Sequence, residues 1–369
     1  MSLRADLLRW TRSQLAVFDP ALMSIIGTLV ALSCVAMYSA ALDFPGRFDT
    51  HLRNLAFAFL VLWVAARIPP SWMMRTAVPL FVLGILLLLA VALFGDVSKG
   101  ARRWLNLGFT RIQPSELMKI AMPLMLAWFF QKRAEVRGWR DYAAAAVILA
   151  VPVFLIARQP DLGTALLVLA AGVYVIFLAG LSWWVIATLI VGAAASAPLL
   201  WSLMHDYQRH RVMTLLDPSS DPLGKGFHII QSTIAVGSGG FWGRGWTAGT
   251  QTHLEFIPER TTDFIFAVYS EEFGFFGNMI LLLVYLMLIA RGLVIASRAA
   301  SEFGRLLAGA ITLIFFTYAF VNMGMVSGIL PVVGVPLPLM SYGGTAMVTL
   351  GLGAGLLMSI HRNRNLVQT

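Results

Sequence analysis

Residues 264–291 read FIFAVYSEEFGFFGNMILLLVYLMLIAR and form the longest apolar segment of the chain. A run of about 20 apolar residues is what an α-helix needs to cross a bilayer. The segment directly before it, residues 205–263, is the only long polar stretch, and it ends in Pro-Glu-Arg-Thr-Thr-Asp. Charged groups are costly at a membrane surface unless they serve a purpose there, so the junction at Asp263 is the first candidate functional position.

The composition extends this membrane assignment to the whole chain. Of the 369 residues, 59% are hydrophobic and only 12% are charged, far from the composition of a soluble domain. Hydropathy predicts an all-α polytopic membrane protein with about ten transmembrane helices and a large extracytoplasmic loop between helices 7 and 8. The window at 143–157 is shorter than an untilted span requires. The predicted spans are 21–42, 52–68, 74–95, 116–131, 143–157, 162–179, 183–204, 264–291, 304–327 and 341–360.

We expect residues 1–369 to form a single integral-membrane domain, with both termini in the cytoplasm. Its parts outside the spans are a cytoplasmic N-terminal segment (1–20), a large periplasmic loop (205–263) and a cytoplasmic tail (361–369). In this orientation 14 of the 27 Lys and Arg residues face the cytoplasm, as the positive-inside rule requires. The formal net charge of +9 therefore reflects membrane topology and anionic lipids, and no nucleic acid partner is expected. The single cysteine, Cys34, excludes a disulfide framework.

Two short motifs place acidic groups at the starts of predicted helices. Pro114 or Ser115 opens a helix, so Glu116 and Lys119, three residues apart, share one face at the outer membrane edge. The structural alternative is a self-neutralising buried ion pair. In such a pair the cost of desolvation roughly cancels the electrostatic attraction, so its net contribution to stability is small. Asp161 follows a proline in a tight outward turn, where it is either a site residue or the N-cap of the next helix.

The third acidic position is Asp263, where the polar loop meets the long apolar helix. A half-desolvated carboxylate has a raised proton affinity, which suits a general base for a sugar hydroxyl. N-capping of the helix is the competing explanation. Glu271 and Glu272 lie about 12 to 14 Å deeper along the same helix, where we expect them to make structural polar contacts between helices.

Basic, glycine and proline residues mark the remaining candidate positions. Arginine binds phosphate or pyrophosphate oxygens in a bidentate manner, and the candidates are Arg103, Arg158, Arg209, Arg211 and Arg260. For Arg209 and Arg211 the alternative is a solvated loop. The glycines between 224 and 249 form no Walker loop, and flexible packing at the bilayer surface with Trp residues at headgroup level is expected. Prolines near residue 335 break the backbone, which must then be buried or line a cavity.

Together, these motifs resemble those of the SEDS family (shape, elongation, division and sporulation) of bacterial peptidoglycan polymerases. The similarity covers nearly the whole chain in family order, and residues 221–246 resemble the elongation branch more than the division branch. Thr261 departs from the pattern, because the family usually shows histidine there. The motifs are GARRWLNLG (100–108), QPSELMK (113–119), RQPDLGT (158–164), DYQRHRVM (206–213) with LDP (216–218), PERTTDFIFAV (258–268) and PLPLMSYGG (336–344).

The resemblance implies inverting glycosyl transfer from lipid II, an undecaprenyl-pyrophosphate-linked disaccharide pentapeptide, to a growing glycan strand at the outer face of the bacterial inner membrane. It implies that Asp263 is the base and that Glu116, Lys119 and Asp161 are cavity residues. It also implies a divalent cation (Mg²⁺ or Mn²⁺), a class B penicillin-binding protein as the transpeptidase partner, and other proteins of the elongation complex that maintains rod shape.

Two rival functions remain open from the sequence. A lipid II flippase would need charged groups at mid-depth of the bilayer, whereas here they gather in the outer third. A non-catalytic scaffold of the elongation complex would not need an intact Asp263 or the Glu116 and Lys119 pair.

The lipid tail is expected in an apolar groove where helices diverge near the fifth span.

Overall fold

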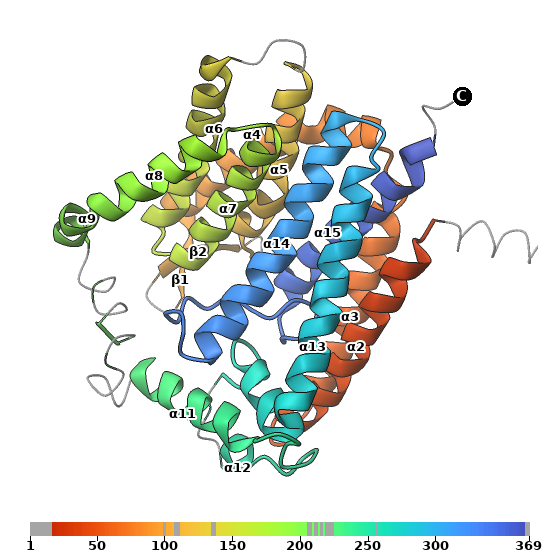
Figure 1. Cartoon of the computed structure of the whole chain (residues 1–369), viewed down its shortest axis with the longest axis vertical. Helices are drawn as coiled ribbons and strands as arrows, with labels where there is room; N and C mark the ends of the chain where they lie inside the picture. Colours follow the sequence, from red (N-terminus) through yellow and green to blue (C-terminus); the bar gives the residue numbers. More distant parts are fainter. Residues whose placement is uncertain are drawn as a thin grey trace, which may run out of the picture.

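The computed structural model describes residues 17–98, 101–106, 111–133, 138–204, 209, 213–214, 217, 225–254, 257 and 259–365. It is a bundle of long helices in which α2, α3, α13, α14 and α15 run side by side, while α8 and α9 extend from the edge (Figure 1). Six of the described helices are long and apolar enough to cross a membrane by length and composition. The chain is therefore a multi-pass membrane protein, as the sequence predicted.

Each of the ten predicted spans corresponds to helical structure. The seventh span is two helices, because α8 ends at Ala195 and α9 starts at Ala197. The helices are α2 (Pro20–Ala40), α3 (Arg47–Ala65), α4 (Pro70–Phe94), α5 (Pro114–Gln131), α6 (Trp139–Arg158), α7 (Leu162–Leu178), α8 (Trp183–Ala195), α9 (Ala197–Leu203), α13 (Ile265–Ser297), α14 (Glu302–Val326) and α15 (Gly344–Arg362).

The fifth span is longer than predicted. Helix α6 has 20 residues and starts at Trp139, four residues before the apolar window. The Asp141 side chain accepts a hydrogen bond from the Gly138 N–H at 3.0 Å, which satisfies one unpaired donor of the first turn. Polar residues of that turn hid the helix start from a hydropathy window, so the expectation of an unusually short helix at this position was wrong.

The connections contain more structure than the sequence suggested. Strands β1 (Asp96–Ser98), β2 (Ala101–Asn106) and β3 (Arg111–Ile112) form a small antiparallel sheet in the order β1-β2-β3. The loop before α13 contains α11 (Lys225–Ser238) and α12 (Thr250–His253), and the short helix η2 (Asn363–Asn365) follows α15. The other regular elements in the described residues are helices, so the predicted fold class holds.

Helices α3 and α15 pack with almost no space between their backbones. A Cβ atom added to Gly351 would lie 2.6 Å from the Ala58 carbonyl oxygen, and one added to Gly355 would lie 2.4 Å from that of Leu62. Any larger side chain at these two positions would push the helices apart. The glycines of the last span therefore allow close helix packing.

Helix α13 is broken at Gly274, whose φ of 64° and ψ of −162° are not helical. The loop after α11 repairs the break with four backbone hydrogen bonds. The N–H groups of Arg244 and Gly245 donate to the carbonyls of Glu271 and Glu272 at 3.0 and 3.1 Å, and those of Phe275 and Phe276 donate to Gly240 and Phe241 at 2.9 and 3.0 Å. This loop is therefore held firmly against α13, contrary to the predicted flexibility.

Two polar contacts join α2 to α13, one near each end. Asp19, the N-cap of α2, accepts hydrogen bonds from Arg291 at 2.7 and 2.8 Å. At the other end, the Ser39 hydroxyl donates to the buried Glu272 carboxylate. Burial opposes ionisation of Asp19, but the hydrogen bonds from Arg291 and the nearby positive charge outweigh it, so the pKa of this carboxyl is lowered. The predicted structural role of Glu272 is confirmed.

Glu271 also has a structural role, as predicted. Its carboxylate accepts hydrogen bonds from the N–H groups of Gln251 and Thr252 at 2.9 and 3.2 Å, in the first turn of α12. A negative charge at a helix N-terminus satisfies unpaired donors and interacts favourably with the helix dipole. Glu271 thereby fixes α12 to the side of α13.

Candidate active site

Asp263 lies in the turn of residues 259–264 that leads into α13, where it is partly buried. The N-cap of α13 is Phe264, and it makes no side-chain capping bond, so the proposed capping role of Asp263 was wrong. The side-chain amide of Asn322, on α14, donates to the backbone carbonyls of Asp263 and Val335 at 2.8 and 2.7 Å. A Cβ atom on Gly334 would lie 3.3 Å from the Asp263 Oδ2 atom. The carboxylate is therefore placed by a buried amide and a glycine.

The segment of residues 327–343, which connects α14 to α15, lies beside Asp263. Its backbone is not helical, yet Val335, Leu337 and Met340 are buried, which confirms the prediction that the proline-broken backbone is enclosed by protein. The Tyr342 N–H donates to the Thr261 carbonyl at 2.8 Å. This bond joins the segment to the turn that carries Asp263.

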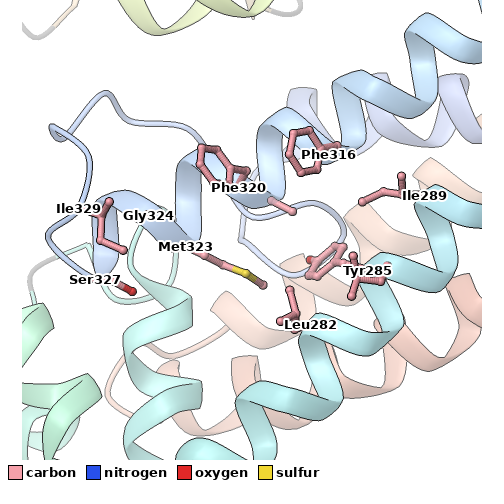
Figure 2. A pocket seen from close by; sticks show the side chains of 11 residues that line it. Leu282, Tyr285, Ile289, Phe316, Phe320, Met323, Gly324, Ser327 and Ile329 are labelled. Carbon is pink, nitrogen blue, oxygen red and sulfur yellow. The ribbon is translucent and has the colours of Figure 1, made fainter.

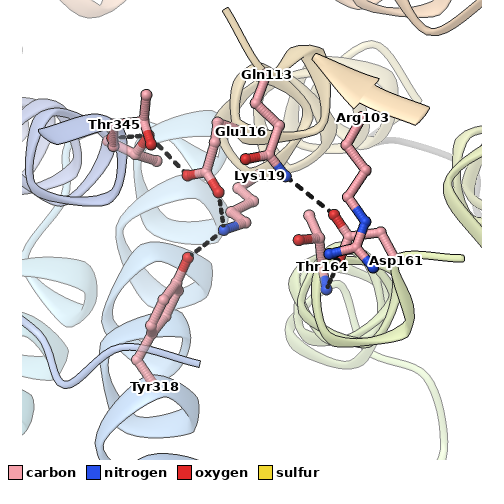
Figure 3. A network of polar contacts seen from close by, with 9 residues as sticks. Arg103, Gln113, Glu116, Lys119, Asp161, Thr164, Tyr318 and Thr345 are labelled. Carbon is pink, nitrogen blue, oxygen red and sulfur yellow. Dashed lines mark hydrogen bonds and ion pairs between the residues drawn. The ribbon is translucent and has the colours of Figure 1, made fainter. Parts of the chain in front are cut away.

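Glu116 and Lys119 form the predicted ion pair on the first turns of α5, with 2.6 Å between Oε1 and Nζ (Figure 3). Lys119 is only 3% exposed and also donates to the Tyr318 hydroxyl of α14 at 2.6 Å. Thr349 of α15 donates to the second Glu116 oxygen at 3.3 Å. The pair is therefore neutralised and joins three helices.

Asp161 is the N-cap of α7, so the structural alternative given for it is confirmed. Its carboxylate accepts from the Thr164 N–H at 3.3 Å and from the Gln113 side-chain amide at 3.0 Å. The Arg103 guanidinium, on β2, lies 3.9 Å away (Figure 3). Asp161 thus connects α7 to the residue that caps α5 and to the sheet.

These residues gather around one part of the fold. A Cβ atom on Gly163, at the start of α7, would lie 2.6 Å from the Val333 carbonyl oxygen, so α7 touches the 327–343 segment, in which Gly334 lies beside Asp263. Tyr318 and Asn322 are four residues apart on α14, which places them on one helical face about 6 Å apart. The structure thereby brings Asp263, the Glu116 and Lys119 pair and Asp161 to one region, although each arrives on a different element.

The predicted arginines differ in their surroundings. Arg103 is partly exposed and donates to the Pro160 carbonyl at 2.5 Å, and the exposed Arg158 lies over the Phe154 ring at the end of α6. Arg209 donates to the Trp201 and Ser202 carbonyls at the end of α9. Arg211 lies outside the described residues. Arg103 and Arg158 are therefore the predicted arginines that flank the Asp161 turn.

Arg260 is the most deeply buried of the predicted arginines that the structure describes, at 1% exposed. Its guanidinium donates to the Ala40 carbonyl at 3.1 Å, to the Thr252 carbonyl and to the Asp43 carboxylate. These partners belong to the end of α2, to α12 and to the turn before α3. Such an enclosed guanidinium favours a structural role for Arg260 over the predicted contact with phosphate.

Arg47, which the sequence interpretation missed, is the arginine that contacts the Asp263 turn from the outside. Its Nη1 donates to the Thr261 hydroxyl at 2.9 Å, and its guanidinium lies over the rings of Phe44 and Tyr342. It stands on the first turn of α3. The alternation of predicted spans already places the first turn of α3 on the Asp263 side of the membrane. Topology combined with charge could therefore have identified Arg47 as a candidate site residue.

A resident metal centre is not built into this region. Within the described part of the chain, no three His, Cys, Asp or Glu side chains gather as metal ligands. Glu116 and Asp161 already face Lys119 and Arg103. Mg²⁺ is usually held by one or two carboxylates together with substrate phosphates. A metal that fits this region would therefore be one held mainly by the phosphates of a bound substrate.

Several apolar grooves open from the surface of the bundle, and two of them are relevant to the site. One lies between α4 and α6 and is lined by Phe81, Ile85, Leu86, Val147 and Val151. The other, of about 250 Å³, lies between α13 and α14 and reaches Ser327 and Ile329 beside the 327–343 segment (Figure 2). The first is where the sequence placed a groove, next to the fifth span.

Comparison with known proteins gives matches over nearly the whole chain. Residues 14–366 match the family model of FtsW, RodA and SpoVE, described as cell cycle protein. The chain is 52% identical to the peptidoglycan glycosyltransferase MrdB of Escherichia coli K12 over 95% of each chain, and 33% identical to the probable peptidoglycan glycosyltransferase FtsW of Aliivibrio salmonicida over 95% of this chain and 90% of the relative.

Solved structures agree with this assignment. The rod shape determining protein RodA of Thermus thermophilus is 30% identical and superimposes with a TM-score of 0.72 over 94% of this chain and 97% of that one. A chain from a peptidoglycan synthase complex, described as coordinating polymerization and crosslinking, is 36% identical with a TM-score of 0.82 over 94% of this chain and 98% of that one.

Proposed function

Because this chain belongs to the FtsW, RodA and SpoVE family of cell cycle proteins, the SEDS family, and is a peptidoglycan glycosyltransferase, we propose that it polymerises lipid II with Asp263 as general base. The observation that carries the assignment is the placement of Asp263 at the start of α13, partly exposed in a turn that is positioned by Asn322 and Gly334. Glu116 pairs with Lys119, and Asp161 caps α7.

In the proposed reaction, an acceptor sugar hydroxyl attacks the anomeric carbon of the donor. A glycosidic C–O bond forms as the bond to the pyrophosphate oxygen breaks, with inversion at that carbon. The hydroxyl proton passes to the Asp263 carboxylate, and the electron pair of the broken bond leaves on undecaprenyl pyrophosphate. General-base catalysis of this kind is worth about 10² to 10⁴-fold in rate.

Cations near the turn stabilise the leaving pyrophosphate. Arg103 and Arg158 flank Asp161, and Arg47 lies beside Thr261 on the other side of Asp263. Positive groups held in place before the reaction stabilise charge as it develops in the transition state. Arg260 is not assigned this role, because its donors are buried and paired.

A divalent cation, Mg²⁺ or Mn²⁺, is part of the proposal. When bound, it would neutralise charge on the pyrophosphate, held by substrate oxygens and the Asp263 carboxylate. The expected observation is that chelation stops polymerisation and that either cation restores it. The melting temperature of the substrate-free protein should stay constant in both conditions, because the described residues form no protein-only metal cage.

The lipid tail is proposed to lie in the groove between α4 and α6. Both helices end close to the cations of the site, α4 at the sheet that carries Arg103 and α6 at Arg158 itself. An apolar groove directly below a cationic surface matches a molecule with a hydrocarbon tail and a pyrophosphate. Replacing Val151 with Trp should raise KM for lipid II and leave kcat nearly unchanged, since it obstructs binding only.

We also infer the cellular setting. The protein lies in the bacterial inner membrane with both termini in the cytoplasm and Asp263 at the outer face, in agreement with the distribution of Lys and Arg. It works with a class B penicillin-binding protein and other elongation-complex proteins. The similarity to a chain from a complex that coordinates polymerization and crosslinking supports a transpeptidase partner.

In the decisive experiment, the purified protein and its transpeptidase partner are reconstituted in proteoliposomes and supplied with lipid II. The glycan chains that form are measured by gel electrophoresis. Asp263→Ala should abolish polymer formation. Asp49→Ala, at an exposed carboxylate on the first turn of α3, is the matched control and should retain full activity. Polymer formation by Asp263→Ala at the wild-type rate would remove the assignment of the base.

The same assay separates the rival functions. A flippase would move fluorescent lipid II between leaflets in the absence of polymerisation, and Asp263→Ala would impair that movement. A scaffold would yield no polymer with either protein, and the substitution would affect only partner binding. The gathering of the charged residues around one end of the bundle, at the start of α13, supports the enzyme.

A further inference from the structure

The distance between the two contacts that join α2 to α13 can be compared with the thickness of a membrane. Asp19 and Ser39 lie about 30 Å apart along α2, and Arg291 and Glu272 lie about 28 Å apart along α13, at about 1.5 Å per residue. Asp19 pairs with Arg291, and Ser39 pairs with Glu272. Both lengths equal the thickness of a bilayer's hydrocarbon core, about 30 Å. A hydrocarbon core that starts at the Asp19 and Arg291 pair would therefore end at the Ser39 and Glu272 contact, on the Asp263 side.

The burial of α13 changes at this level. From Ile265 to Glu272 every residue is buried in the protein. After the break at Gly274, the side chains of Phe275, Phe276, Leu283 and others are exposed on the outside of the bundle. A membrane-spanning helix exposes large apolar side chains to lipid, so the lipid-facing surface of α13 starts at Phe275.

Aromatic side chains gather at the same level. Phe241 packs against Phe275 with ring centroids 5.8 Å apart, and Trp242 packs against Phe276 at 5.6 Å. Trp246 lies 5.5 Å from Tyr38, near the end of α2, and its indole N–H donates to the Val35 carbonyl at 3.1 Å. We name Phe241, Trp242, Trp246, Phe275 and Phe276 the aromatic anchor. Each of its members is at least half exposed.

The anchor is exposed although its backbone is fixed. The loop between Gly240 and Gly245 has its backbone bonded into the break of α13, and a Cβ atom on Gly243 would lie 2.1 Å from the Glu272 carbonyl oxygen. Trp242, at 74%, is the most exposed of the five. A rigid, water-exposed patch of five large rings would be costly in solution, which indicates that another phase covers it.

We propose that the aromatic anchor inserts into the leaflet on the Asp263 side, with lipid as its occupant. Three observations favour lipid: the patch is continuous with the lipid-facing side of α13, it lies at the boundary marked by Ser39 and Glu272, and it pairs Trp with the adjacent exposed Arg244. Tryptophan and arginine at one level are typical of a membrane interface. The described loop between Gly240 and Gly245 thus seats in the bilayer instead of projecting from it.

The anchor sets the height of the catalytic turn. Asp263 lies nine residues before Glu272, so it stands at most about 13 Å above the core boundary. The headgroup layer of one leaflet is about 5 to 8 Å thick. Building on the proposed function, this height places the carboxylate just above the phosphates, where the first sugar of a lipid-linked pyrophosphate would lie.

Depth measurement by spin labelling tests the proposal. Cys34 is the only cysteine, so a Cys34→Ala background accepts single labels at Trp242→Cys and Phe276→Cys. The labelled protein alone is placed in phosphatidylethanolamine and phosphatidylglycerol vesicles, and the collision rates with O₂ and with a water-soluble nickel chelate are compared. Leu283→Cys provides the lipid reference and Asp49→Cys the aqueous one.

Both anchor labels should collide mainly with O₂, at a depth about 10 Å shallower than the label at Leu283. Collision rates equal to those at Asp49 would overturn the proposal. Shielding from both reagents would also overturn it, because a protein surface would then cover the patch. Circular dichroism confirms folding of each variant. The measurement needs no substrate, so its failure is distinguishable from failure of the polymerisation assay.

Discussion

Tyr318 and Asn322 lie one turn apart on the same face of α14, and each holds a different part of the site. The Tyr318 hydroxyl accepts from Lys119, whereas the Asn322 amide donates to the carbonyls of Asp263 and Val335. Helix α14 is therefore the common support of a site whose other residues come from α5, the start of α7, the 259–264 turn and the 327–343 segment.

Replacing Asn322 with Leu should lower kcat at least about tenfold and change KM little. The substitution leaves two backbone carbonyls without their donor, each worth about 1 to 3 kcal/mol, so the Asp263 turn loses its fixed position. Steady-state kinetics on lipid II would show the split between kcat and KM. Phe320→Leu, at an exposed position on the same helix, is the control and should stay within twofold of wild type.

The effect of a methyl group at Gly334 separates strain from placement of the carboxylate. Gly334 and Gly328 have nearly the same left-handed φ, 74° and 73°, so Ala costs about 1 kcal/mol of backbone strain at either. Only at Gly334 would the added Cβ lie beside the Asp263 carboxylate, at 3.3 Å. Gly334→Ala should reduce kcat severalfold more than Gly328→Ala at equal thermal stability. Equal kinetic losses would contradict the assigned contact.

Arg47→Ala should lower kcat/KM by about tenfold or more, since hydrogen bonds to charged groups contribute about 1.5 to 3 kcal/mol. Thr261→Val removes the same hydrogen bond from the other side and leaves the guanidinium in place. If Arg47 binds the pyrophosphate, Thr261→Val should cost at most about threefold. Equal losses in the two variants would show that Arg47 only holds the turn. Arg53→Ala, at an exposed position of α3, should behave as wild type.

Asp19→Asn should reduce the free energy of unfolding by about 2 kcal/mol at pH 7, measured by denaturant titration in mixed micelles. Breaking a fully buried ion pair costs about 3 to 5 kcal/mol, and Arg291 retains 24% side-chain exposure, which reduces the value. The pKa of Asp19 is lowered by folding, so its contribution is complete above the ordinary value of 3.8 and disappears as the pH falls through the folded pKa. The difference between variant and wild type should shrink accordingly.

Hydropathy alone predicted the bundle, because a helix that meets lipid must expose apolar side chains along its length. It failed where polarity interrupts the pattern. Helix α6 starts before its apolar window through the cap at Asp141, and α11, α12 and the small sheet lie in polar connections that a hydropathy window does not resolve. Local hydrogen bonds decide these elements, and their partners are often distant in sequence.

The site was predictable only in part for the same reason. Spacing within one helix was enough to pair Glu116 with Lys119. It could not distinguish Arg260, which is enclosed by α2 and α12, from Arg47, which meets the catalytic turn, because burial of an arginine depends on elements that are remote in the chain. Asn322 carries no charge or motif signal, and only the packing of α14 against the 327–343 segment shows its role.

The backbone contact between α3 and α15 has a genetic consequence. Arg47 opens α3, and α15 starts two residues after Tyr342, so the two helices that flank the catalytic turn are clamped together at Gly351 and Gly355. A side chain at Gly355 would push the two helices apart. Because helices are stiff, this displacement would reach the catalytic turn at their ends. Loss-of-function alleles in a random screen should therefore cluster at these glycines as well, about 10 to 17 Å along α15 from the end where the reaction takes place.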